Sequence, residues 1–423
     1  RPVYLSAFIT DEIRLGTGAT YRNVGNGLFN YQYSSDAQDF RDDEPGGIWR
    51  NLYSVIDRAN RVLAFMELVP TTNDAEVALK AQYRGELLGL RAMAHIELLR
   101  WYASTVQYSP DAPGVVLQTE YVKSPATYFP SRSTQAVVVA AINKDLVEAR
   151  TLIPAGFADI SRITRNAIIA FQARVAQHTG NWQAVVDRST EVLALQPITP
   201  RGGYAAIWTS RTLASNQSTE VIWKLNVQSA NLGVAVGSLF QDANAAVQAS
   251  PALKLINSYD KTNDIRFPTF FRATPAPTGL IAKYGAVENS NGENFQYDIK
   301  MVRSSELLLA RAEANAELGQ LASANNDLAT LRAARIANYV HVNITDKTAL
   351  INEVLLERYR ELAFEGQRYH DLRRRALPIQ RDIQDVAGSA SIQTLLPTDP
   401  RYLLPIPQPE VFANPNIGQN AGY

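Results

Sequence analysis

Helical periodicity in two blocks of the chain constrains its fold more than any other sequence feature. Between Trp49 and Met66, apolar residues recur three and four positions apart, which places them on one face of a helix. The same kind of pattern predicts further helices over 76–102, from Ser133 or Thr134 to Pro154, over 164–195 as a pair, and over 304–318, 322–337 and 348–365. The chain is therefore expected to be mostly α-helical.

Two of the predicted helical hairpins share one arrangement of small and bulky residues. Ala173 precedes Gly180, and Ala312 precedes Gly319, by the same interval. In each hairpin the small residue lets two helices cross, the glycine permits the turn, and bulky residues follow on the second helix. This spacing is typical of tetratricopeptide repeats, in which each hairpin covers the apolar face of its neighbour. We therefore expect several stacked helical hairpins.

Two segments interrupt the helical pattern. Residues 15–48 are rich in glycine, whereas glycine, proline, asparagine and aromatic residues dominate 197–301, where strand-like runs such as Val221–Val227 are short. Irregular loops are expected there, with a short helix near the beginning of the chain. Loops of this kind, held by a rigid scaffold, commonly carry binding sites.

The same two segments combine rings, amides and charged groups in a way that suits a sugar. Sugars have flat C–H faces on which aromatic rings stack, while polar side chains bind the surrounding hydroxyls. We expect the site where residues 21–45 approach residues 200–300. The candidate ligand-binding residues are Tyr31, Tyr33, Asp36, Asp39, Phe40, Arg41, Phe270, Phe271, Asn294 and Tyr297. The alternative for any one ring is that it packs a loop onto the helices.

Composition and motifs argue against catalysis, metal binding and nucleic-acid binding. The 41 basic residues balance 41 acidic residues, so no basic face for a phosphate backbone is expected. The absence of cysteine excludes disulfides and thiolate metal sites. The motifs of zinc proteases, serine hydrolases and P-loop enzymes are missing from the sequence. We predict a protein that is not an enzyme and uses no cofactor or metal.

Two motifs with acidic residues are candidates for a catalytic or metal-binding site. Asp42, Asp43 and Glu44 are adjacent acids in a loop rich in glycine and proline, where such groups are usually solvated. His370 and Asp371 are neighbours on a predicted helix and so do not face each other. We interpret the first group as solvent-exposed and the second as structural.

Residues 351–374, INEVLLERYRELAFEGQRYHDLRR, resemble the signature helix of the SusD/RagB family. The matching residues are Glu357, Arg358, Glu361, Leu362, Phe364, Glu365, Gly366, Arg368, Asp371, Leu372 and Arg374. Residues 49–60 with 84–102, residues 303–314 and the closing LLPIPQPEVFANPNIGQNAGY are similar to other motifs of that family, in the same order. The resemblance covers most of the chain.

The resemblance implies a fold: a mostly α-helical, tetratricopeptide-like scaffold with long irregular insertions and few short strands. It implies one domain over 1–423, with helical pairs at about 49–105, 135–195, 304–338 and 348–375, and a loop-rich ligand-binding region at about 197–301 plus 15–48. The family's first helix is expected to be absent or to end near Leu5.

The resemblance also implies a role. Such proteins are non-catalytic and lie on the bacterial cell surface, where they capture oligosaccharides for import by a SusC-like TonB-dependent transporter of the outer membrane. They are lipid-anchored through an N-terminal cysteine, which, with the signal peptide, would precede residue 1 here. A peptide-binding member of the family and a tetratricopeptide scaffold for protein partners remain alternatives. A glycoside hydrolase would need two carboxylates roughly 5–10 Å apart across a cleft, and no such pair stands out.

The charged residues of the signature segment are expected to be structural. Glu357, Glu361 and Glu365 are spaced one helical turn apart, and Arg358 and Arg368 lie close to them in sequence. We predict charge pairing that fixes the last long helix against the scaffold. Gly366 is expected to end that helix in a left-handed conformation.

Overall fold

The computed structural model describes residues 2–15, 25–33, 44–124, 127–209, 219–227, 240, 249–272, 280–284, 297–386 and 391–423. Helices dominate this part of the chain, as predicted. The longer ones are α1 (Pro2–Ile9), α3 (Glu44–Met66), α4 (Asp74–Tyr102), α5 (Gln135–Leu152), α6 (Arg165–Thr179), α7 (Trp182–Leu195), α8 (Arg201–Thr209), α11 (Ser304–Glu317), α12 (Leu321–Ala333) and α13 (Lys347–Glu361). Short helices are α2 (Asn26–Phe29), α9 (Leu253–Asn257), α10 (Arg266–Phe270), α14 (Arg368–Arg374) and α15 (Gln408–Ala413).

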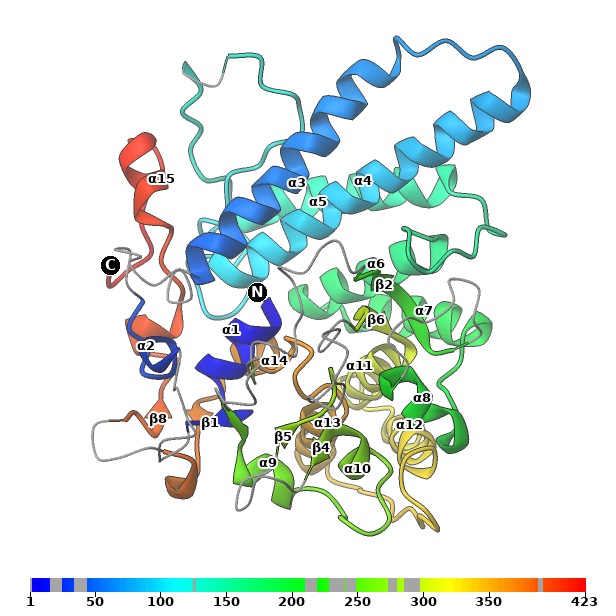
Figure 1. The fold of residues 1–423 in the computed structure, drawn as a ribbon, viewed down its shortest axis with the longest axis vertical. Helices are drawn as coiled ribbons and strands as arrows, with labels where there is room; N and C mark the ends of the chain where they lie inside the picture. Colours follow the sequence, from blue (N-terminus) through cyan, green and yellow to red (C-terminus); the bar gives the residue numbers. More distant parts are fainter. Residues whose placement is uncertain are drawn as a thin grey trace, which may run out of the picture.

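Helices α3 and α4 form a long antiparallel hairpin that extends beyond the rest of the scaffold (Figure 1). Helix α4 begins where Asn73 accepts a hydrogen bond from the Glu76 backbone N–H, at 3.0 Å. Helix α5 packs against α4, and Thr134 caps it by accepting from the Val137 backbone N–H. The predicted cap of this helix is therefore confirmed.

The two hairpins predicted from the repeat are α6–α7 and α11–α12. Gly180 and Gly319 follow the first helix of each pair with φ of 74° and 77°, a backbone conformation that glycine adopts without steric cost. Ala173 and Ala312 are buried, and α7 packs against α11. The range 135–195 contains the three helices α5, α6 and α7, and α5 packs against both α4 and α6.

Two sequence predictions about helix ends were wrong. Helix α13 ends at Glu361, before the expected end near Gly366, since Phe364 has a positive φ of 60° and its backbone N–H donates to the Glu12 carboxyl group at 2.7 Å. Gly366 does have a positive φ of 79°, but it lies in the turn that follows the helix. Helix α1 continues to Ile9, beyond the expected end near Leu5, since every residue from Val3 to Ile9 is buried.

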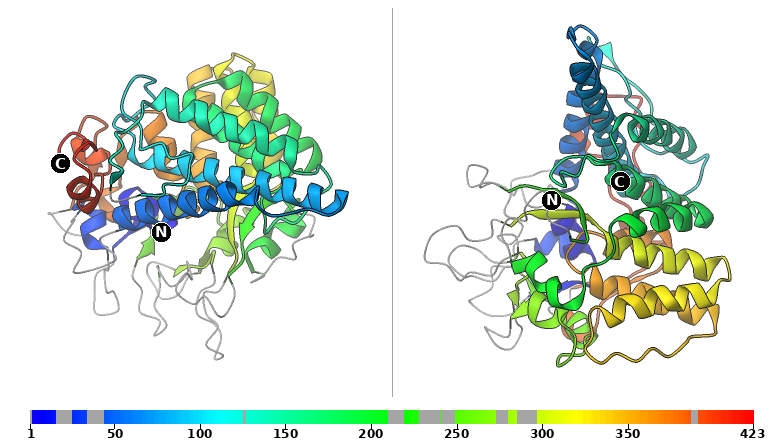
Figure 2. Two further views of the ribbon diagram at one scale, coloured as in Figure 1. Left: turned by 90° about the horizontal axis from the view of Figure 1, so that it is seen from above. Right: turned by 90° about the vertical axis from the view of Figure 1, so that its right-hand side faces the viewer.

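The insertion contains short antiparallel strand pairs. Strand β2 (Val221–Leu225) pairs with β6 (Ile299–Arg303), which leads directly into α11. Strand β1 (Ile13–Arg14) pairs with β3 (Ser250–Pro251), and so joins the N-terminal segment to the insertion. The remaining pairs are β4 (Phe271–Arg272) with β5 (Leu280–Ile281), and β7 (Ile379–Gln380) with β8 (Thr394–Leu395). Figure 2 shows the long helices on one side of the molecule and the green and yellow strands of the insertion on the other.

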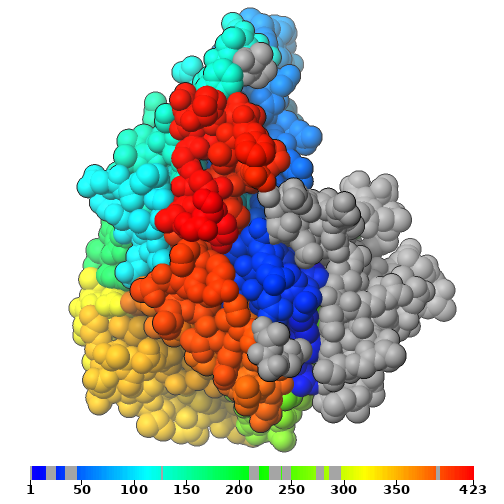
Figure 3. Space-filling view, turned by 90° about the vertical axis from the view of Figure 1, so that its left-hand side faces the viewer, coloured from blue at the N-terminus to red at the C-terminus, as the bar shows by residue number. Residues whose placement is uncertain are grey.

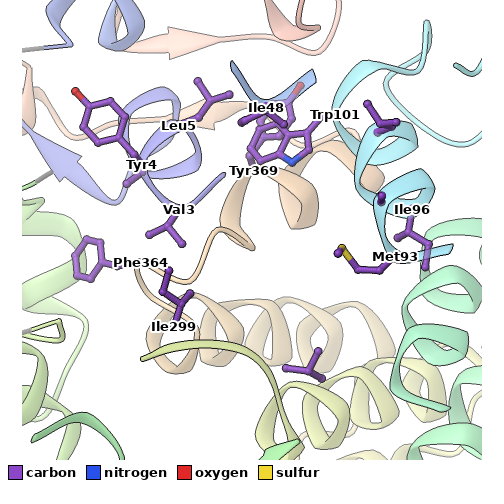
Figure 4. Packing of buried hydrophobic residues seen from close by; sticks show 14 of the residues in the cluster. Val3, Tyr4, Leu5, Ile48, Met93, Ile96, Trp101, Ile299, Phe364 and Tyr369 are labelled. Carbon is purple, nitrogen blue, oxygen red and sulfur yellow. The ribbon is translucent and has the colours of Figure 1, made fainter. Parts of the chain in front are cut away.

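The largest cluster of buried apolar side chains draws on the chain from Val3 to Ile417. In Figure 4, residues of α1 lie near Trp101 of α4 and Tyr369 of α14, whose rings stack 5.1 Å apart. The two ends of the chain therefore share one core with the scaffold. Among the described helices, none is long and apolar enough to cross a membrane.

Candidate functional site

The carboxylates of the signature segment lie in a buried ionic network, as predicted. Glu357 contacts Arg266 and Arg332 at 2.6 and 2.7 Å. Glu361 contacts Arg303 and Arg335 at 3.0 and 3.1 Å. Because Arg266 comes from the insertion and Arg303 ends β6, the network fastens the insertion to α13.

The electrostatics of this network exclude a general-acid role for its carboxylates. Burial alone would raise the pKa of the Glu361 carboxyl, but Arg335, Arg303 and Arg266 lower it well below the usual range. The side chains of Glu357, Glu361 and Arg303 are fully buried. A charged, fully paired carboxylate without access to solvent cannot reach a substrate, so the network is structural.

A second buried ion pair joins the signature segment to the N-terminal segment. Arg368 donates to both carboxylate oxygens of Asp11, at 2.7 and 2.8 Å. Lys254 Nζ also contacts Asp11, at 2.8 Å, and the Arg368 guanidinium lies 4.3 Å from the centre of the Tyr359 ring. The expected charge pairing thus includes partners from three distant parts of the sequence.

His370 and Asp371 occupy structural positions. Asp371 is paired with Arg358 at 2.8 Å, while the His370 ring meets the Trp101 ring edge-on at 4.4 Å. Burial and the neighbouring arginines lower the pKa of His370 well below its ordinary value, so the ring is neutral. In the described part of the chain, no cluster of histidine and acidic residues is arranged to hold a metal ion. Asp42, Asp43 and the Glu44 side chain lie outside the described residues.

The aromatic residues of the insertion form a packed cluster. Trp208 meets Phe270 and Tyr284 edge-on, with ring centres 5.8 and 6.0 Å apart. Lys283 Nζ lies 4.2 Å from the centre of the Trp208 ring. Phe270 is fully buried and Phe271 is 5% exposed, so their faces are not open for stacking on a sugar. For these two rings, the alternative of loop packing describes the observed contacts.

A surface hollow of ≈ 360 Å³ lies between the N-terminal segment, the beginning of α3 and the C-terminal segment. We call it the C-terminal hollow. Figure 3 shows the C-terminal segment, in red, next to N-terminal residues in blue on this face. The lining residues are Tyr33, Pro45, Gly46, Pro405, Ile406, Pro407, Gln408, Pro409, Val411, Phe412, Gln419 and Tyr423.

Three aromatic rings line the C-terminal hollow. The rings of Tyr33 and Tyr423 are 6.3 Å apart and tilted by 51°. Phe412, on α15, is 77% exposed, so most of its ring is free to meet a ligand. No charged side chain belongs to the described lining, which therefore favours a neutral ligand with apolar faces.

The structure separates the predicted site residues. Tyr33 lines the C-terminal hollow, whereas Tyr31 is buried beside Arg381, whose guanidinium lies 5.0 Å from its ring centre. Tyr297 is partly buried against the core. Five predicted residues fall outside the described residues: Asp36, Asp39, Phe40, Arg41 and Asn294.

Sequence reasoning did not identify the C-terminal residues as part of a candidate site. The run of prolines at 405, 407 and 409 was visible and indicated an irregular tail. Phe412 and Tyr423 stand out only because the structure exposes them beside Tyr33.

The fold and site define a class of protein: a stack of helical hairpins that supports an uncharged surface hollow lined with aromatic rings. Two family models match the chain, one described as "SusD family" over residues 254–423 and one as "Starch-binding associating with outer membrane" over residues 14–176. The chain belongs to the SusD/RagB family.

Known relatives agree with this assignment. A SusD-like protein of Formosa agariphila is 23% identical over 429 residues, which cover 89% of this chain and 79% of that protein. A crystal structure of a putative sugar-binding protein from Bacteroides vulgatus matches with a TM-score of 0.84 and 23% identity, covering 100% of this chain and 93% of that one. A SusD superfamily structure from Bacteroides thetaiotaomicron matches with a TM-score of 0.81 and 21% identity, over 99% and 94% of the two chains. The predicted family and fold class are confirmed.

Proposed function

We propose that this protein is a non-catalytic receptor that captures oligosaccharides at the bacterial outer-membrane surface and passes them to a SusC-like TonB-dependent transporter. Family membership supports a carbohydrate ligand, since one matching model is described as starch-binding and associated with the outer membrane. The B. vulgatus protein that shares the fold is itself named a putative sugar-binding protein. Attachment by a lipid anchor that precedes residue 1 belongs to the same proposal.

The observation that carries the carbohydrate proposal is the aromatic lining of the C-terminal hollow. Tyr33, Phe412 and Tyr423 line the hollow with aromatic rings, and the described lining residues include no charged side chain that a neutral sugar would have to desolvate. A shallow hollow of this size accommodates a few sugar units at most. We therefore expect affinities of about −8 to −4 kcal/mol, which correspond to micromolar to millimolar dissociation constants.

Isothermal titration with a panel of oligosaccharides tests this site. Phe412→Ala is the informative variant, because the ring is exposed and its removal leaves no cavity in the core. We expect this variant to bind about tenfold more weakly than the wild type, a loss near 1.4 kcal/mol. Tyr83→Ala, on α4 and also exposed, is the matched control and should bind normally. Unchanged glycan binding by Phe412→Ala would place the ligand elsewhere.

The same titrations separate the alternatives. Binding of a peptide pool but of no glycan would assign the protein to a peptide-binding role. Appearance of shorter oligosaccharides after incubation would identify a hydrolase. A pull-down from outer-membrane extract tests the transporter partnership, which fails if no TonB-dependent transporter is retained.

A further inference from the structure

A small cavity lies where the ends of three helices meet, away from the C-terminal hollow. It is lined by Arg100 of α4, by Arg174, Gln177 and His178 of α6, by His370, Arg373 and Arg374 of α14, and by Val106. The cavity volume is ≈ 10 Å³, which leaves room for a single small ion or molecule. No acidic side chain is part of this lining in the described structure.

One cation at this cavity has no acidic partner. Arg373 is 3% exposed, and its N–H groups donate to the backbone carbonyl oxygens of residues 100, 101, 103, 105 and 106. Among the described residues, no carboxylate lies within ion-pair distance of it, whereas Arg100 and Arg174 each have one and Arg374 has two. These carbonyl oxygens accept from all five N–H groups of Arg373, so it offers a ligand no free donor, but its positive charge makes an anion more favourable at this cavity than a cation.

Two histidines add unused polar atoms. Both ring nitrogens of His370, which is 4% exposed, and Nε2 of His178 are buried without a hydrogen-bond partner. The nearest carboxylate to His370 is that of Glu97, 4.0 Å from Nε2, and this acid is already paired with Arg100 at 2.7 Å. Buried polar atoms normally have partners, so atoms left free beside a cavity point to a bound particle.

We propose that this cavity binds one small inorganic anion of the size of chloride, held between His178, His370 and the arginines. A neutral imidazole keeps one N–H to donate, and burial together with the nearby arginines lowers the pKa of both rings. The anion supplies the counter-charge that Arg373 lacks. It also bridges α4, α6 and α14, and so joins the signature helix to the first helical pairs.

Crystals grown with bromide in place of chloride test the site directly. The expected result is an anomalous bromide peak in this cavity of the wild-type protein. Density there with no anomalous signal identifies a water molecule and overturns the proposal. This measurement needs no variant, so it decides the question even where a substitution prevents folding.

Thermal unfolding in sodium chloride and in sodium gluconate, at equal ionic strength, gives a second test. We expect chloride to raise the Tm of the wild type by a few degrees, because a ligand bound only by the folded state stabilises it. His370→Phe keeps the ring against Trp101 but removes both nitrogens, and it should lose the chloride effect. His341→Phe, a control on a surface loop, should retain it. An equal chloride effect in His370→Phe and the wild type would contradict the proposal.

Discussion

Replacing Arg368 by alanine tests whether the signature segment is structural. The change removes both hydrogen bonds to Asp11 and leaves that carboxylate buried with Lys254 as its one remaining cation among the described residues. Breaking a buried ion pair by removing one partner typically costs about 3–5 kcal/mol. Since Lys254 stays 2.8 Å from Asp11, the expected loss is at the lower end, about 3 kcal/mol. Loss of the contact with the Tyr359 ring adds roughly 0.5–1 kcal/mol.

Urea unfolding followed by circular dichroism measures this loss, and titration with the same glycan measures binding. Arg401→Ala is the matched control, because its pair with Asp399 is exposed and should contribute less than about 1 kcal/mol. Adding Asp11→Asn to the Arg368→Ala variant should recover part of the stability, since it removes a buried carboxylate that has lost both of its hydrogen bonds from Arg368. An Arg368→Ala variant with unchanged urea unfolding that no longer binds its ligand would show that the residue acts in binding, and the reasoning would be wrong.

Three other perturbations follow from contacts in the scaffold. Burial raises the pKa of Glu12 from 4.5 to about 8, so between these pH values the folded state holds a proton that the unfolded state releases. The free energy of unfolding should therefore fall as the pH rises from 4.5 to 8, by at most about 5 kcal/mol. Glu12→Gln should reduce this pH dependence when urea unfolding is measured across the same range. Gly85→Ala should lower the free energy of unfolding by about 1–3 kcal/mol, because the added Cβ would lie 2.8 Å from an Ile153 atom. Gly156→Ala is the control: its Cβ would meet no atom within 4 Å, so the free energy of unfolding should not fall. Asp346→Ala removes the cap of α13, an expected loss of about 1 kcal/mol in thermal unfolding, and an unchanged midpoint would contradict the assigned cap.

Local patterns in the sequence were enough to predict the scaffold. The cap at Thr134 and the turns at Gly180 and Gly319 depend on residues a few positions apart, so they can be recognised from the sequence without the tertiary structure. The signature glutamates were likewise predicted to be paired. Their partners were not, because Arg266 and Arg303 reach them across a long stretch of sequence that carries no local signal.

The ligand site was less accessible to sequence reasoning for a physical reason. A ring that stacks on a sugar and a ring that fills a core are the same residue type, and only exposure distinguishes them. Phe270 and Tyr33 looked alike in the sequence, yet the first is fully buried and the second lines the C-terminal hollow. Phe412 lies outside the two loop-rich segments in which the sequence predicts the ligand site.

Helix α1 has a consequence for how the protein reaches its folded state. It has no polar face, and its core partners include α14 near the other end of the chain. The ion pair just beyond it joins residues 357 positions apart. During synthesis from the N-terminus, this apolar stretch emerges long before the residues that will cover it, and contacts of such long range form slowly. The segment that forms α1 is therefore an exposed apolar stretch early in synthesis. It must be protected from aggregation until the last helices of the chain have formed.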